Sequence, residues 1–105
     1  MTMDANEKNQ ILLTQLILMF QTAALQQMGK IKNPLTDKIE RDLFQAQISI
    51  DILDMIQVKM KGNLTTQEEK LLSGVLQDLK LNYVDETMKE DKTPPLPEPQ
   101  GQSST

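Results

Sequence analysis

The 105-residue sequence contains no cysteine, no histidine and no tryptophan, and its aromatic side chains are two phenylalanines and one tyrosine. Without cysteine and histidine it lacks disulfides and the usual ligands of structural zinc and haem. Histidine-based acid–base catalysis and cysteine nucleophiles are excluded for the same reason. The core must come from leucine, isoleucine, valine and seven methionines. We therefore expect a protein that is not an enzyme and that holds no cofactor.

Positive charge is also scarce. Eleven lysine and arginine residues stand against fifteen aspartate and glutamate residues, which gives a formal net charge of −4. Because nucleic-acid binding depends on basic side chains that neutralise phosphates, this balance predicts no nucleic-acid partner. Residues 1–10 lack the positive start and small-residue cleavage site of a secretory signal. We expect a cytoplasmic protein.

The longest stretch without charge lies between Lys8 and Lys30, and its length raises the question of a membrane span. Glutamine and threonine recur along it at helical spacing, and each would need a hydrogen-bond partner in hydrocarbon. These polar residues favour a soluble helix over residues 7–28 and argue against a membrane span. Residues 1–6 are expected to fray. Gly29 is expected to end the helix in the left-handed conformation.

Two further helices are predicted, over residues 37–61 and 65–88. Thr36 or Asp37 is a suitable N-cap for the second helix, and two apolar stripes along it indicate neighbours on two sides. The third helix starts at a capping box, in which Thr65 and Glu68 satisfy each other's backbone N–H groups. The predicted fold class is all-α, with a long helical hairpin and a third helix.

The C-terminal residues 90–105 differ in composition from the rest of the chain. Four prolines and a glycine fall within residues 94–101, and serine and threonine follow. Such a segment buries too little apolar surface to fold by itself. We therefore predict one helical domain over residues 7–89 and a disordered, proline-rich tail.

The first predicted helix is apolar on more sides than two neighbouring helices can cover. Burying one leucine or isoleucine side chain stabilises a protein by about 1.5–3 kcal/mol, so several exposed ones favour association. We expect the chain to complete a bundle as a homodimer or higher homo-oligomer, or to bind another protein. The predicted interface residues are Leu12, Leu13, Leu16, Ile17, Met19, Phe20, Ala23, Ala24, Ile48, Ile52 and Met55.

Two alternatives remain open. Asp51 and Asp54 lie three residues apart on the second predicted helix, with Glu68 and Asp78 further along the chain. Paired carboxylates can bind a divalent ion or perform acid–base chemistry, although a solvated helix face explains the same residues. The first alternative is therefore a small ion-binding protein or carboxylate-based enzyme. The second is peripheral membrane association through the first helix.

Several short segments occur in a recognisable order. Met28-Gly29-Lys30 is followed by Asn33-Pro34, by Ile50-Asp51-Ile52-Leu53-Asp54-Met55 and by Lys61-Gly62-Asn63-Leu64-Thr65. Over residues 16–84 the chain thereby resembles a bacterial family classed as a domain of unknown function, number 1844 in that series. Met60 departs from the pattern, in which threonine is expected. The resemblance implies a short, helical, cytosolic protein and brings no established activity or site.

Overall fold

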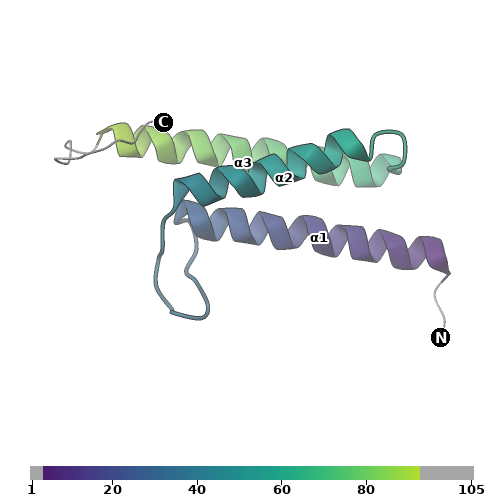
Figure 1. The fold of residues 1–105 in the computed structure, drawn as a ribbon, viewed down its shortest axis with the longest axis horizontal. Coiled ribbons are helices and arrows are strands. Elements are labelled where there is room, and N and C mark those ends of the chain that lie inside the picture. The colour runs from purple at the N-terminus through teal and green to yellow at the C-terminus, as the bar shows by residue number, and fades with distance from the viewer. Residues whose placement is uncertain (1–3, 93–105) are drawn as a thin grey trace.

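The computed structural model describes residues 4–92, and within that range the chain forms three α-helices and no strand (Figure 1). The helices are α1 (Ala5–Met28), α2 (Leu43–Lys59) and α3 (Thr66–Lys92). A long loop joins α1 to the antiparallel α2, and a short turn leads into α3, which runs back beside α2 (Figure 1). The predicted all-α class is confirmed. The predicted disordered tail begins at residue 90, which is wrong for residues 90–92 because they belong to α3. Its remaining residues, 93–105, lie outside the described part of the chain.

α1 begins earlier than predicted, because Asp4 caps it. The Asp4 carboxylate accepts from the Glu7 N–H at 2.8 Å, and the Asp4 N–H donates to the Glu7 carboxylate at 3.2 Å. This reciprocal pair is a capping box, which satisfies two backbone donors at the start of the helix. Ala5 and Asn6 are therefore helical, and the expectation that residues 1–6 all fray is wrong for these two.

The predicted start of the second helix near residue 37 is wrong, since α2 begins at Leu43. Asp37 takes the left-handed conformation (φ 58°), and its N–H donates to the Asn33 carbonyl at 2.7 Å. The Asn33 N–H also donates to the Lys38 carbonyl at 2.8 Å, which closes a tight turn over residues 33–38. The N-cap is Asp42, whose carboxylate accepts from the Gln45 N–H. The loop is therefore six residues longer than expected.

α3 begins where the capping box predicts. The Thr65 N–H donates to Glu68 Oε1 at 2.9 Å, and the Glu68 N–H donates to Thr65 Oγ1 at 3.1 Å. The helix continues to Lys92, four residues beyond its predicted end. Both signals at this start are local, which is why the sequence pattern places it correctly.

The core is formed by one stripe from each helix, at spacings of three, four and seven residues. Such spacing places the side chains on one side of a helix. α1 contributes no more of them than the shorter α2, since only three of its 24 residues are buried. The buried apolar residues are Ile17, Ala24 and Met28 of α1, Ala46, Ile50 and Leu53 of α2, and Leu72, Val75, Leu76 and Leu79 of α3.

Candidate interaction surface

The contact between Gln27 of α1 and Ser49 of α2 marks where these two helices meet. The Ser49 hydroxyl lies 2.7 Å from the Gln27 side-chain amide. On its other side α2 faces α3, where Asp54 pairs with Lys80 at 3.0 Å. Going around each helix away from α3, the next side after Ser49 on α2 lies beside the next side after Gln27 on α1. α3 covers neither of these two sides.

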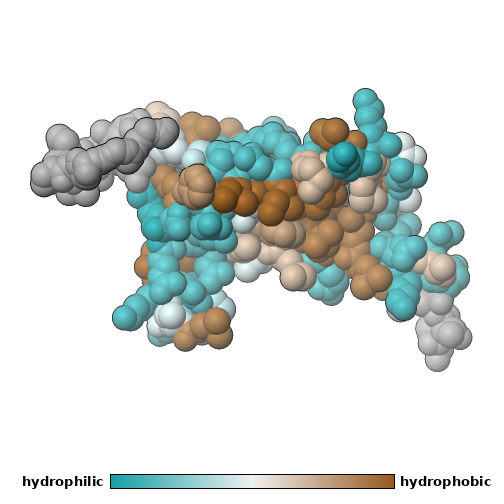
Figure 2. Space-filling view, in the orientation of Figure 1, coloured by the Kyte–Doolittle hydropathy of each residue, from teal (hydrophilic) through white to brown (hydrophobic). Residues whose placement is uncertain are grey.

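Apolar side chains fill these two neighbouring sides. Each helix contributes a stripe with spacings of four and three residues, which keeps its members on one side of the helix. Figure 2 shows the result as a continuous brown area that extends from α2 to α1 on the side facing the viewer. We call this surface the α1–α2 apolar face. It comprises Leu12, Leu16, Met19 and Ala23 of α1 with Ile48, Ile52 and Met55 of α2.

The structure divides the eleven predicted interface residues into two groups. Seven form the α1–α2 apolar face, and five of these are exposed by more than a third, with Met19 at 64%. The other four turn toward the core. Ile17 and Ala24 are fully buried, and Leu13 and Phe20 are half-buried and pack against them. The assignment of Ile17 and Ala24 to an interface is therefore wrong, because their spacing of seven residues places them on the side that meets α2 and α3.

Some exposed apolar residues were not predicted to form a surface. The side of α3 that faces away from the core carries Leu81, Val84 and Met88, each more than half exposed. Their spacing of three and four residues was visible in the sequence, and it is out of phase with the buried stripe of the same helix. Phe44 and Val58 of α2 are exposed by about three quarters as well. The chain thus has apolar surface outside the α1–α2 apolar face.

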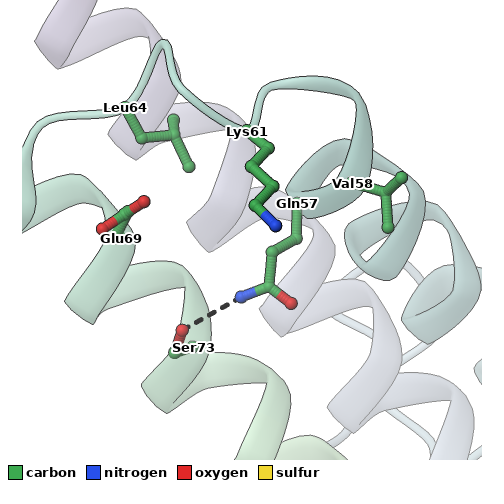
Figure 3. Close-up of a pocket in the computed structure, with 6 residues that line it drawn as sticks. All are labelled: Gln57, Val58, Lys61, Leu64, Glu69 and Ser73. Atoms are coloured by element: carbon green, nitrogen blue, oxygen red, sulfur yellow. Dashed lines mark hydrogen bonds between the residues drawn. The ribbon is translucent and has the colours of Figure 1, made fainter.

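A shallow hollow of about 450 Å³ lies where α2 turns into α3 (Figure 3). Gln57 Nε2 donates to Ser73 Oγ at 3.0 Å across it, and Lys61 and Glu69 bring opposite charges to its sides. None of its lining residues is buried. Ligand sites hold a few fixed polar groups in a concave, largely apolar setting. Here the polar side chains are open to solvent, and Gln57 and Ser73 are paired with each other.

Three of the four carboxylates considered as ion ligands have separate partners. Asp54 pairs with Lys80, Asp51 accepts from Gln47 Nε2 at 2.8 Å, and Glu68 caps α3. Among the described side chains, those of residues 4–89, no group of three or more acidic residues is placed so that it could hold a metal ion. The structure does not bring together the residues on which an ion-binding site would depend.

Among residues 4–89, the most deeply buried carboxylate belongs to Glu86, at the end of the molecule where the α1–α2 loop meets α3. Its side chain is 8% exposed and lies 2.8 Å from Lys30 Nζ, 3.3 Å from Arg41 Nε and 3.0 Å from Lys89 Nζ. Arg41 Nη2 also donates to the Glu86 carbonyl at 2.7 Å. A buried charge is costly unless it is paired and hydrogen-bonded, and these cations satisfy it. The cluster thereby ties the loop to α3.

Hydrogen bonds from Lys30 shift the pKa values of the two carboxylates that it contacts, Asp85 and Glu86. They hold the pKa of Glu86 and of Asp85 below the ordinary values, although burial of Glu86 acts in the opposite direction. The same hydrogen bonds raise the pKa of Lys30. All three groups therefore keep their charges around neutral pH, where the cluster is a structural tie between loop and helix.

Gly29 makes this arrangement possible. It takes the left-handed conformation (φ 87°), its N–H donates to the Gln26 carbonyl, and the Lys30 N–H donates to the Leu25 carbonyl. This pair of bonds is a Schellman motif, which ends a helix and usually needs glycine. A Cβ atom at Gly29 would lie 3.3 Å from Arg41 Cδ. The position is thus restricted both by backbone conformation and by a neighbouring side chain.

Substitution of Gly29 by alanine is expected to lower the free energy of unfolding by about 1–2 kcal/mol, the cost of a left-handed alanine, and further through the contact with Arg41. Gly62 shares the conformation (φ 88°) but has no atom within 4 Å. Gly62→Ala is therefore the matched control and should lose only the conformational part. Urea denaturation of both variants measures the difference, and equal losses would show that the Arg41 contact is irrelevant.

α1 also meets the length and composition requirements for a membrane-crossing helix. It is the one helix among residues 4–92 that does so, and 17% of its most apolar 18-residue window is buried. Core helices of soluble proteins meet the same requirements, but they are mostly buried, and α1 is not. Gln15, Thr22 and Gln26 line an open hollow along this helix, and such side chains need hydrogen-bond partners in hydrocarbon.

Comparison with known proteins identifies a family. The model of the family described as a domain of unknown function (DUF1844) matches residues 10–85, which confirms and extends the resemblance seen over residues 16–84. No curated protein and no solved structure matches the chain. The matched range contains the whole α1–α2 apolar face and ends one residue before Glu86. The chain therefore belongs to the DUF1844 family.

Proposed function

We propose that this protein is a non-catalytic interaction protein that self-associates through the α1–α2 apolar face. The observation that carries the proposal is the exposure of this face, with Leu12 54% and Met19 64% exposed in the single chain. Contiguous apolar patches of several hundred Å² on a soluble protein mark interaction sites. Each Å² of apolar surface removed from water contributes roughly 25 cal/mol, so covering the face favours association.

A second copy suits this face better than a charged partner. α1 has no charged side chain between Lys8 and Lys30, so two copies can meet there without bringing like charges together. The whole chain is acidic, with a net charge of −4, so contact between charged surfaces of two copies is repulsive on average. Electrostatic mismatch of this kind suppresses unfavourable orientations. Self-association is therefore directed to the neutral face.

Light scattering of the purified protein over a range of concentrations tests the proposal. We expect a native mass of at least twice the 11.9 kDa of one chain. Met19→Lys should reduce the mass to that of the single chain, because a charge would be buried at the centre of the interface without a partner. Met88→Lys is the matched control, since Met88 is 53% exposed on α3 outside the face. This control should keep the mass of the unmodified protein.

Association with membranes is an alternative supported by the length and composition of α1. It predicts a monomer in solution that sediments with phosphatidylcholine and phosphatidylglycerol vesicles, and loss of that binding in Met19→Lys. A monomer at all concentrations would overturn self-association, and vesicle binding by that monomer would support the membrane alternative in its place. The ion-binding alternative has no comparable structural observation behind it.

A further inference from the structure

The α1 stripe of the α1–α2 apolar face has a spacing that reads the same in both directions. Leu12, Leu16, Met19 and Ala23 are separated by four, three and four residues. In a twofold-symmetric dimer the same surface is used on both copies, so it must be complementary to itself. A stripe with palindromic spacing meets this condition when one helix is reversed against the other.

We infer that α1 packs antiparallel against α1 of a second copy, about a twofold axis that passes between Leu16 and Met19. In this register Leu16 lies opposite Met19 of the second copy, and Leu12 lies opposite Ala23 of the second copy. The inference rests on the proposed function and adds the orientation and register of the partner helix.

Side-chain size supports the antiparallel orientation. Leu12 is large and exposed, whereas Ala23 is small and half-buried, so pairing them lets the helices approach to the usual 8–10 Å between axes. In a parallel pair, Leu12 would meet its own copy at one end and Ala23 its own copy at the other. That arrangement would crowd one end and leave a void at the other, whereas protein interfaces pack without voids.

The residues on either side of the α1 stripe are also compatible with this dimer. The proposed twofold axis places each side of the stripe next to the same side of the stripe in the second copy. On one flank, Gln15, Thr22 and Gln26 lie beside the same polar residues of the second copy, where they can exchange hydrogen bonds at the rim. On the other flank, α2 with Ile48 and Ile52 lies beside α2 of the second copy. Antiparallel α1 helices also set the positive end of each helix dipole beside the negative end of the other.

The cysteine-free sequence allows a direct test by disulfide trapping. The Leu12→Cys variant, carrying an affinity tag, is mixed with untagged Ala23→Cys, left to exchange subunits and oxidised. We expect a disulfide mainly between the two different variants. In the antiparallel register, two copies of residue 12 lie about 16 Å apart along the helix axis, as do two copies of residue 23, and a disulfide needs Cα atoms within about 7 Å. Circular dichroism checks that both variants fold.

The disulfide pattern tests the antiparallel register separately from self-association. Dominant 12–12 and 23–23 disulfides in a native dimer would overturn the antiparallel register and leave self-association standing. A Leu81→Cys variant controls for random collisions, because Leu81 is 64% exposed on α3 away from the face. It should form only the small amount of disulfide that chance collisions between molecules produce. The protein could be dimeric by light scattering and still form no more 12–23 disulfide than the Leu81→Cys control forms 81–81 disulfide. That result would also overturn the register.

Discussion

Replacing Leu79 by alanine is expected to lower the free energy of unfolding by about 2–5 kcal/mol. Leu79 is fully buried, in the core stripe of α3 that meets α1 and α2. The change removes buried methyl groups and leaves a cavity that three packed helices can close only in part. A loss of this size is a large share of the 5–15 kcal/mol that holds a typical domain folded.

Leu81→Ala is the matched control for this prediction, because it makes the same chemical change two residues further along α3. Leu81 is 64% exposed, so its truncation creates no cavity and is expected to change stability by no more than about 0.5 kcal/mol. Urea denaturation of both variants at one fixed protein concentration measures the difference, since self-association would make stability depend on concentration. Similar losses in the two variants would contradict the position of Leu79 in the core.

Helix ends set by neighbouring residues could be predicted from the sequence. Thr65 and Glu68 are three residues apart and form their capping box without help from the rest of the chain. Gly29 likewise ends α1 through its own backbone conformation. These signals operate within one turn of helix, so the spacing of residues along the chain is sufficient to find them.

The start of α2 is harder to predict in this way, because Thr36, Asp37 and Asp42 each offer a local cap and distant contacts favour Asp42. Thr36 and Asp37 follow Pro34 and offer a suitable local cap, yet residues 33–38 form a turn. The Asp42 N–H donates to the Gln27 carbonyl at 2.7 Å, fifteen residues away. Arg41 reaches Glu86, 45 residues away. No short segment carries such information, and the Glu86 cluster had no sequence signal for the same reason.

The sequence predicts which helices form the candidate site, but it identifies only part of the residues on the surface. The neutral stretch of α1 indicated more apolar surface than a single chain can cover, and that is where the α1–α2 apolar face lies. Which side of α1 faces the core was harder to predict, since periodicity identifies a core side only by contrast with charged sides. Ile17 and Met19 look alike in the sequence, yet one is fully buried and the other is 64% exposed.

Glu86→Gln is expected to lower the free energy of unfolding by about 1.5–3 kcal/mol at neutral pH, the range for hydrogen bonds to charged groups. Glutamine keeps the size of the side chain but removes the charge that Lys30, Arg41 and Lys89 surround. These cations are themselves partly exposed and can regain water, which keeps the loss below that of a fully buried ion pair.

The same substitution should change how stability depends on pH. The pKa of Glu86 is lowered in the folded chain, mainly by the hydrogen bond from Lys30. A lowered carboxyl pKa contributes stability that is fully present above the unfolded value of about 4.3 and is lost as the pH falls through the lower folded value. The difference between the unmodified protein and Glu86→Gln should therefore be constant from pH 6 to 8 and shrink below about pH 4.3.

Asp85→Asn removes a charge from the same cluster at an exposed position, so comparison with Glu86→Gln shows how much burial contributes. Asp85 is also held below its ordinary pKa by Lys30, but its side chain is 55% exposed against 8% for Glu86. Water screens exposed ion pairs, so Asp85→Asn should cost much less than Glu86→Gln and change the pH dependence less. Urea denaturation between pH 3 and 8 tests both, because urea adds no salt that would screen the charges. Identical pH profiles for Glu86→Gln and the unmodified protein would mean that Lys30 and Arg41 bind the loop to α3 without the Glu86 charge.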